Sequence, residues 1–248
     1  MTVNMNDSSA TIILLDIEGT TTPIDFVYKT LFPFARGRVK DYLSRNWEAP
    51  EVQSNLTQLR AERSADVAQG LNPPALEDES SAEQLESAVA YIHWLMDRDR
   101  KSTPLKAIQG RIWREGYQAG ELFGEVFDDV PPAFARWRRQ DILICIYSSG
   151  SALAQKLLFA HTTAGDLTGY IFRYFDTTIG HKIEAGSYLR IAEELQLAPA
   201  EIVFISDAIA ELDAASEAGM KTILATRPGN RSVEHPVNHP IVDSFSSL

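Results

Sequence analysis

The stretch "TIILLDIEGTTTPIDF", residues 11–26, is the most informative part of the chain. Its apolar run is rich in isoleucine and leucine, which predicts a short strand buried on both faces, as in the centre of a parallel sheet. Two acids, Asp16 and Glu18, then stand at the end of that strand, followed by a glycine and three threonines. Buried carboxylates are costly unless they are paired. These two acids therefore call for a chemical explanation.

Three further apolar runs of strand length are "DILICIYSS" (141–149), "EIVFISDA" (201–208) and "KTILAT" (221–226). Between and after them, helical patterns cover 151–162, 186–197 and 208–219. Strands that alternate with helices at this spacing predict right-handed βαβ units. The expected fold class is α/β, with a doubly wound, Rossmann-like parallel sheet.

The first two strands are separated by a long interval that is helical in pattern. It also contains a proline-rich, acidic stretch at 70–83, which predicts a loop between helices. We expect a helical cap domain over 21–124, inserted into a core domain formed by 1–20 and 125–248. The tail after 226 is expected to be irregular, with one short strand at most. The helical patterns of the interval cover 31–47, 82–100 and 104–120.

Composition narrows the possible partners. Of the 248 residues 44% are hydrophobic and 23% charged, and the net charge is −11, which disfavours nucleic acid and anionic membranes. The single cysteine, Cys145, cannot form an internal disulfide, and no apolar run approaches the ~18 residues of a membrane span. The first ten residues lack the pattern of a secretory signal. We expect a cytoplasmic protein, monomeric because no coiled-coil heptad or long exposed apolar helix is evident, that acts on a small molecule.

Polar, reactive residues follow three of the predicted strands. In open parallel sheets, ligands bind at the carboxyl ends of the strands, near the point where the strand order reverses. We therefore expect these side chains to converge at one edge of the sheet. They are Asp16 and Glu18 after the first strand, Ser148 and Ser149 after the second, and Ser206 and Asp207 at the end of the third.

The residue types predict phosphoryl transfer. Asp16 and Asp207 would repel each other unless a hard cation lay between them, and Mg²⁺ prefers a few carboxylates, waters and a substrate phosphate. Ser148 and Ser149, at the start of a helix, form a seat for an anion. Lys182 adds a positive charge that can neutralise a carboxylate or a phosphate oxygen. In such a site a carboxylate can attack phosphorus, forming an aspartyl-phosphate that water then hydrolyses.

Each of these residues also has an ordinary structural interpretation. Asp16 could cap a turn, and Asp207 could cap the helix that follows it. Ser148 and Ser149 could cap the helix near residue 151. Lys182 could be a solvated surface charge. Taken singly, each interpretation is the more common one, but their order along the chain and their places at strand ends favour a joint site.

The order of these residues resembles the haloacid dehalogenase superfamily of Mg²⁺-dependent phosphatases. That superfamily usually has aspartate at the second acidic position, where this chain has Glu18. The glutamate, within "DIEGTTTPIDFV", resembles one branch, the enolase-phosphatases (acireductone synthases) of methionine salvage. The resemblance covers nearly the whole chain. It extends through "LFPFAR", "LKAIQGRIWREGY", "FDDVPPAF", "IYSSGS", "FDTTIGHKIEAGSY" and "FISD".

The resemblance implies roles for the two acids of the first motif and for the metal site. Asp16 would be the nucleophile and a metal ligand. Glu18 would protonate the leaving oxygen, activate water and lie at the metal. Asp207 would complete the site for one Mg²⁺ per subunit. Glu211 would support a metal-bound water, or would be a surface residue.

The resemblance likewise implies that Ser148, Ser149 and Lys182 bind the substrate phosphate. The implied reaction is the enolisation and dephosphorylation of 2,3-diketo-5-methylthiopentyl 1-phosphate to an acireductone. Glu18 is the candidate base for the enolisation, and the inserted helices would close over the site. Three alternatives stay open: a phosphatase for another small phosphate ester, a signalling receiver domain, and an inactive scaffold. The large insertion disfavours a receiver, and the filled catalytic positions disfavour a scaffold.

Overall fold

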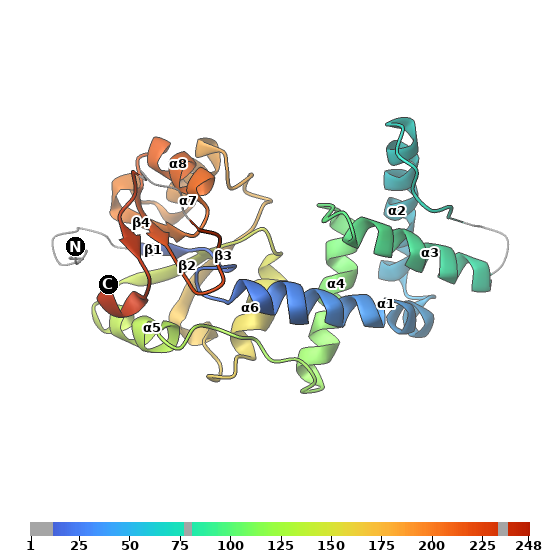
Figure 1. The fold of residues 1–248 in the computed structure, drawn as a ribbon, viewed down its shortest axis with the longest axis horizontal. Helices are drawn as coiled ribbons and strands as arrows, with labels where there is room; N and C mark the ends of the chain where they lie inside the picture. The colour runs from blue at the N-terminus through green and yellow to red at the C-terminus, as the bar shows by residue number, and fades with distance from the viewer. Residues whose placement is uncertain (1–11, 77–80, 233–237) are drawn as a thin grey trace. The chain divides into compact units, whose positions relative to one another are not determined.

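A six-stranded parallel sheet forms the centre of the larger part of the molecule (Figure 1). The structure is a computed structural model that describes residues 12–76, 81–232 and 238–248. The strand order is β3-β2-β1-β4-β5-β6. The strands are β1 (Ile12–Leu15), β2 (Leu143–Tyr147), β3 (Ile171–Phe175), β4 (Ile202–Ser206), β5 (Lys221–Ala225) and β6 (Ile241–Val242).

Helices cover both faces of the sheet. Successive residues of a strand point to opposite faces, so Ile12 and Leu14 pack against α7 and α8, whereas Ile13 and Leu15 face the other layer. Figure 1 shows α7 and α8 on one side of the sheet and α5 on the other. This burial on both faces explains the apolar run of β1. The helices of this part are α5 (Val130–Arg139), α6 (Ala152–Ala160), α7 (Ala185–Leu195) and α8 (Ile209–Glu217), with short 3₁₀ turns at Thr168–Tyr170 (η3), Pro199–Glu201 (η4) and Phe245–Ser247 (η5).

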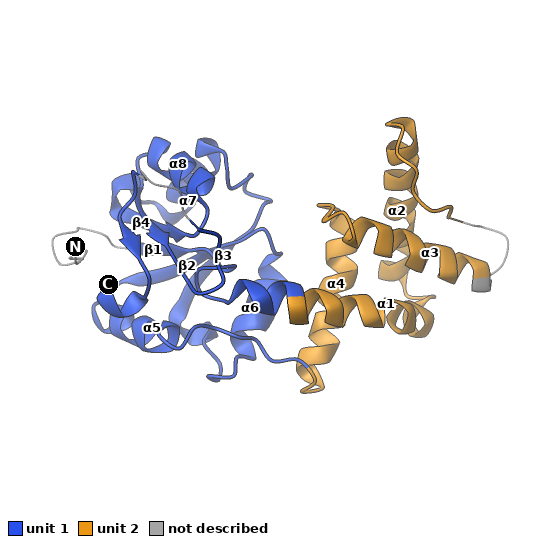
Figure 2. Ribbon diagram, viewed as in Figure 1, with its two compact units in different colours: residues 1–28, 122–248 blue, residues 29–121 orange. Residues whose placement is uncertain are grey.

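The chain divides into two compact units, coloured separately in Figure 2. The sheet unit comprises residues 1–28 and 122–248, and the helical unit comprises residues 29–121. A π-helical segment, η2 (Phe26–Leu31), runs across the boundary between them in the chain. The helical unit contains α1 (Phe32–Asn46), α2 (Pro50–Ala68), α3 (Ser81–Met96) and α4 (Thr103–Gln118).

The helical unit has its own core and its own buried ion pair. Asp66 on α2 is 1% exposed, and its carboxylate accepts hydrogen bonds from the Tyr91 hydroxyl (2.8 Å) and from Arg100 Nη2 (2.6 Å). On α4, Trp113 stacks on Phe32 of α1, with ring centroids 6.2 Å apart. Each oxygen of the Asp66 carboxylate thus has a donor.

The predicted α/β class with a parallel sheet is confirmed. The four predicted strands correspond to β1, β2, β4 and β5, but the edge strand β3 was not predicted. A loop was expected over 70–83. Residues 71–76 are non-helical, as expected, and residues 77–80 lie outside the described residues. The prediction is wrong for 81–83, because α3 begins at Ser81. Thr11, the first residue of the stretch 11–26, also lies outside the described residues, as do residues 1–10, where no secretory signal was expected.

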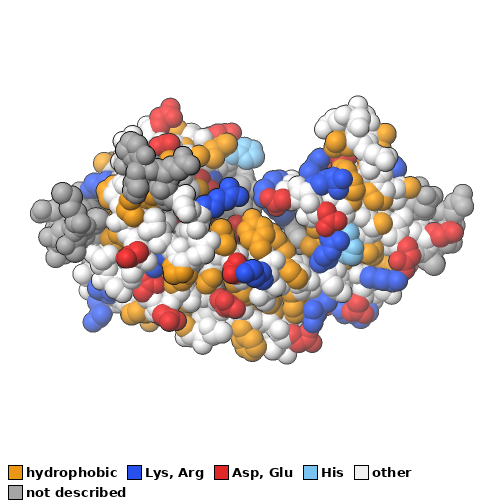
Figure 3. Space-filling model, viewed as in Figure 1, with side chains coloured by type: hydrophobic (Ala, Val, Ile, Leu, Met, Phe, Trp, Pro, Cys, Tyr) orange, Lys and Arg blue, Asp and Glu red, His pale blue; other side chains and the backbone are white. Residues whose placement is uncertain are grey.

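The distribution of charge on the surface is relevant to the prediction that the protein binds neither nucleic acid nor membranes. On the face shown in Figure 3, acidic and basic side chains are interspersed over both units. None of the helices in the described ranges is both long and apolar enough to span a bilayer.

Candidate active site

The parallel register brings the strand-end residues of β1, β2 and β4 to one edge of the sheet. Leu15 of β1 is in register with Ile146 of β2 and with Ile205 of β4. The next residue, Asp16, extends the ladder by one bond, because its backbone N–H donates to Ile205 O at 3.0 Å. From β1 the chain builds the sheet outward through β2 and β3, and then on the opposite side through β4 to β6. The strand order therefore reverses at Asp16, where α/β proteins place ligands.

Lys182 is the centre of a buried ion cluster at this edge. Its side chain is 8% exposed, and its Nζ lies 2.6 Å from Asp16 Oδ1 and 2.5 Å from Glu211 Oε2. The loop that carries Lys182 is held by the Tyr188 hydroxyl, which donates to Lys182 O at 2.6 Å. Although burial acts to lower it, the two carboxylates raise the pKa of Lys182 above its ordinary value. The ordinary interpretation of Lys182 as a solvated surface charge is wrong.

Ser206, the last residue of β4, closes this cluster into a ring. Its hydroxyl donates to Glu211 Oε2 at 2.9 Å and lies 3.3 Å from Asp16 Oδ2. Its oxygen also accepts from the backbone N–H of Ala208. Glu211, on the first turn of α8, is therefore part of the site and not a surface residue; its side chain is 16% exposed. The sequence placed Ser206 at this edge but suggested no role for it.

Asp16 itself is 5% exposed and held from several sides. Its Oδ1 accepts a hydrogen bond of 2.7 Å from Ile17 N as well as the contact with Lys182. Among the described residues, the hydrogen-bonding contact of its Oδ2 is the one with Ser206, at 3.3 Å. Oδ2 is thus the less heavily engaged oxygen, and it is the better placed of the two to react with a substrate.

Asp207 lies on the other side of the Asp16 turn, against Gly19. Gly19 has a φ of +67°, and a Cβ placed there would come within 2.4 Å of Asp207 Oδ2. Only glycine satisfies both the backbone conformation and the approach of this carboxylate. Burial, followed by the charge of Asp16, raises the pKa of Asp207 to about 7. The α8 helix is not capped by Asp207, since its first flanking residue is Ala208 and no side chain caps it.

Glu18 lies in the same turn and is half-buried. The turn is tightened by the Gly19 N–H, which donates to Thr22 O, and by the N–H groups of residues 20–22, which donate to Ile17 O. The Glu18 charge is among those that raise the pKa of Asp207. The structure therefore brings Glu18 into electrostatic range of Asp207.

The expected anion seat follows β2. Ser148 is 4% exposed, and its Oγ accepts from the Gly150 N–H at 3.1 Å. Ser149 is half-buried. The helix α6 is capped by Ser151, whose Oγ accepts from Ala154 N, so the interpretation of Ser148 and Ser149 as its caps is wrong.

A buried amide that the sequence did not indicate holds this seat in place. Gln155, on the first turn of α6, is 2% exposed. Its Nε2 donates to Gly150 O and to Phe175 O, both at 2.8 Å. The Ser148 N–H also donates to Phe175 O. The ends of β2 and β3 are thereby tied together behind the two serines.

The donor set at this edge suits a hard divalent cation. Four carboxylates, those of Asp16, Glu18, Asp207 and Glu211, stand against the single positive charge of Lys182. Burial and the charge of Asp16 raise the pKa of Glu211 to about 7, which reflects the same excess of negative charge. In the described parts of the chain, no three His, Cys, Asp or Glu side chains form a preassembled metal site. Mg²⁺ does not need one, because it binds through one or two carboxylates, waters and substrate phosphate.

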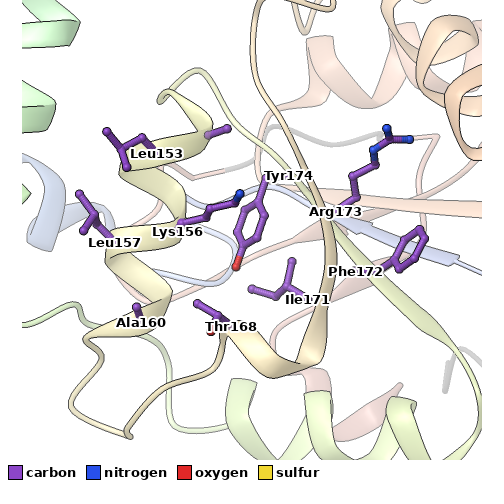
Figure 4. Close-up of a pocket in the computed structure, with 10 residues that line it drawn as sticks. Leu153, Lys156, Leu157, Ala160, Thr168, Ile171, Phe172, Arg173 and Tyr174 are labelled. Carbon is purple, nitrogen blue, oxygen red and sulfur yellow. The ribbon is translucent and has the colours of Figure 1, made fainter.

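A separate pocket of about 660 Å³ lies between α6 and β3 in the sheet unit (Figure 4). Its lining includes Leu153, Lys156, Phe172 and Tyr174, and none of the predicted site residues. The Lys156 ammonium lies 5.6 Å from the centre of the Tyr174 ring. The chemistry of the sheet edge therefore does not extend into this pocket.

Comparison with known proteins places these observations in a family context. Residues 10–219 match the family model of haloacid dehalogenase-like hydrolases. The chain is 52% identical over 226 residues to a protein of Synechococcus elongatus named enolase-phosphatase E1, covering 91% of this chain and 92% of the relative. A Xenopus tropicalis protein of the same name is 42% identical over 243 residues, covering 96% and 94%. Among solved structures, the UTR4 protein of Saccharomyces cerevisiae matches with a TM-score of 0.77 and 33% identity, over 96% of this chain and all of that chain.

Proposed function

We propose that the sheet edge at Asp16 and Lys182 carries out the reaction of the enolase-phosphatases. The chain belongs to the haloacid dehalogenase-like hydrolases and, within them, to the enolase-phosphatase family. The substrate is 2,3-diketo-5-methylthiopentyl 1-phosphate, and the products are the acireductone 1,2-dihydroxy-3-keto-5-methylthiopentene and phosphate, in methionine salvage. The observation that carries the proposal is the 2.6 Å contact between Lys182 Nζ and Asp16 Oδ1 at the reversal point of the sheet. The contact places a positive charge beside the carboxylate that the proposed mechanism uses as its nucleophile.

The phosphatase step uses Asp16 as the nucleophile. An oxygen of Asp16 attacks phosphorus, the bond from phosphorus to the ester oxygen breaks, and Glu18 gives a proton to the leaving oxygen. Water then attacks the aspartyl-phosphate and loses a proton to Glu18, which releases phosphate and regenerates Asp16. Ser148, Ser149 and Lys182 hold the phosphate oxygens during both displacements.

Asp16 and Asp207, with Glu18 beside them, would hold one Mg²⁺, which supplies Lewis-acid stabilisation of negative charge on phosphate and on a substrate carbonyl. Asp16 thereby both binds the metal and reacts. In the enolisation step, a base must remove a proton from the carbon that bears the phosphate group. We assign this role to Glu18, because a carboxylate at its position already transfers protons in the phosphatase step.

The inserted helices, predicted over 21–124, would act as a cap that excludes water and selects the methylthio-bearing substrate. The protein would act as a cytoplasmic monomer. Sedimentation analysis of the purified protein tests the monomeric state, and a dimer at micromolar concentration would contradict it.

One assay tests the reaction. Purified protein is mixed with Mg²⁺ and the diketo-methylthiopentyl phosphate, and enol absorbance and phosphate release are followed together. Wild type is expected to form an absorbing enol before releasing phosphate, while Asp16→Asn and an EDTA-treated sample release none. Should the wild type ignore this substrate and cleave a simple phosphate ester with the same requirement for Asp16 and Mg²⁺, the substrate assignment falls and the phosphatase mechanism stands.

The role of Glu18 needs a separate variant. Glu18→Gln is expected to form no enol and to release phosphate slowly, because the amide can neither accept nor give the required proton. Formation of the enol at the wild-type rate by this variant would move the enolisation base to another residue.

A further inference from the structure

Asn230, in the loop after β5, is tied to the same turn as the two acids of β1. Its Nδ2 donates to Gly19 O at 2.8 Å and lies 3.4 Å from Ala225 O. Carbonyl oxygens only accept hydrogen bonds, so the nitrogen of the amide must face them. The orientation of the amide is therefore determined, and Oδ1 faces the opposite way.

The Oδ1 atom of Asn230 is a buried acceptor with no hydrogen-bond donor among the described residues. A Cβ built on Gly19 would lie 2.8 Å from this oxygen and 2.4 Å from Asp207 Oδ2. The amide oxygen and the carboxylate oxygen thus approach the same point beside Gly19. The buried Asn230 oxygen beside a carboxylate calls for a donor or a cation at this point, because unpaired buried acceptors are rare in native proteins.

We propose that Asn230 is a positioning residue of the metal site, with Oδ1 directed at the cation or at a water bound to it next to Asp207. This inference rests on the proposed function, which places Mg²⁺ at Asp16 and Asp207. Residues around a metal that orient its ligands and waters typically change metal affinity when they are removed. The competing explanation is purely structural: Nδ2 would clamp the Gly19 turn and Oδ1 would contribute nothing.

Two substitutions separate these explanations. Asn230→Ala removes both the donor and the acceptor. Asn230→Asp retains an oxygen in place of Oδ1 but removes the donors to the Gly19 and Ala225 carbonyls. Mg²⁺ alone is titrated into each substrate-free, full-length protein by isothermal calorimetry, so that the readout is metal affinity and not turnover.

Gln155→Leu provides a matched control. Gln155 is also a buried amide whose nitrogen donates to two carbonyls and whose Oε1 has no partner among the described residues. It holds the seat after β2, however, and not the turn beside Asp207. Its loss is expected to lower the melting temperature and to leave Mg²⁺ affinity unchanged.

We expect Asn230→Ala to weaken Mg²⁺ binding about 10-fold or more, and Asn230→Asp to bind at least as tightly as wild type. Equal affinities for wild type and Asn230→Ala would overturn the inference, and so would an Asn230→Asp protein as weak as Asn230→Ala. If Asn230→Ala does not fold, Asn230→Asp against wild type decides the question alone. If the wild type binds no Mg²⁺, the proposed cofactor itself is wrong. That outcome differs from one in which the wild type and Asn230→Ala bind Mg²⁺ equally well, which overturns only the role of Asn230.

Discussion

The two units each bury an ion cluster, and the two clusters differ in charge balance. In the helical unit, Asp66 is paired with Arg100, and the Tyr91 hydroxyl donates to its second oxygen. In the sheet unit, Lys182 alone faces Asp16 and Glu211, with Asp207 and Glu18 close enough to add their charges. The buried carboxylate of the first cluster has an arginine as its own partner, whereas in the second one lysine is shared by two carboxylates with two more nearby.

This difference separates a structural ion pair from a reactive site. A buried pair with all its hydrogen bonds made stabilises one packing arrangement of its helices. A buried cluster with surplus carboxylates is costly on its own, and its repulsion is relieved when a cation binds or when a carboxylate takes up a proton. Burial of charge is therefore common to both units, and imbalance of charge is the feature that distinguishes the proposed site.

The largest expected effect comes from removing the proposed nucleophile. Asp16→Asn should lower the rate of phosphate release at least about 10⁴-fold, because the amide that replaces the Asp16 carboxylate cannot attack phosphorus. It should not lower the melting temperature, because Lys182 keeps Glu211 as a partner and the cluster loses one surplus negative charge. Phosphate assays and thermal melts test both parts. A melting temperature several degrees below wild type would show that the cluster is as balanced as the one in the helical unit.

Removing the cation of the cluster should damage both activity and stability. Lys182→Met leaves two buried carboxylates facing each other, and we expect a loss of about 3–5 kcal/mol in the free energy of unfolding. Phosphate release should fall about 10²–10³-fold. Adding Glu211→Gln to this variant should restore part of the stability, which urea titrations would show. A double variant no more stable than Lys182→Met would argue against repulsion as the cause.

The matching change in the helical unit should affect stability alone. Asp66→Asn removes the charge partner of Arg100, which is 38% exposed and can turn to water, so the expected loss is about 1–3 kcal/mol. Turnover per folded molecule should stay within about twofold of wild type. The measurement pairs a urea titration with a phosphate assay at a temperature where both proteins are fully folded. A tenfold loss of turnover would give the Asp66 cluster a part in catalysis.

The smallest expected effect on stability comes from a third buried ion pair, between Asp129 and Arg227. Asp129 also accepts hydrogen bonds from residues 244 and 245 near the end of the chain. Although burial acts to raise it, the hydrogen bonds from Arg227 and from the Phe245 N–H lower the pKa of Asp129 below its ordinary value. A lowered pKa means that its stabilisation is complete above the unfolded-state value of about 3.9 and is lost as the pH falls through the folded-state value. Asp129→Asn should therefore lose less stability than wild type between about pH 5 and pH 2. Parallel acid slopes for the two proteins would contradict this.

The sequence was a good guide wherever a strand is central and a residue follows it directly. Asp16, Ser148 and Asp207 were predicted at one edge because the carboxyl ends of buried parallel strands must meet there. The edge strand β3 was missed, since it carries an exposed Phe172 and an irregular register against β2, which break the apolar pattern. Edge strands are only partly buried and so carry a weaker signal.

Residues held by tertiary contacts could not be found from local pattern. The burial of Lys182 depends on two carboxylates from distant strands and helices, and a lone lysine in a loop gives no sign of them. Gln155 and Asn230 act through their amide orientation, which only the positions of neighbouring carbonyls determine. For Glu211, its spacing of one helical turn after Asp207 was a local sign of a place in the site. The same spacing was equally compatible with an exposed surface residue.

The single cysteine has a practical consequence. Cys145 lies in the middle of strand β2, is fully buried, and burial raises the pKa of its thiol to about 12. Because the thiolate is the reactive form, maleimide dyes should leave the native protein unlabelled. Cysteines introduced at one exposed position of each unit, such as Arg114 in α4 and Leu189 in α7, would then accept a pair of fluorophores without any need to replace Cys145. Energy transfer between the two dyes would then test in solution whether the distance between the units changes when substrate binds.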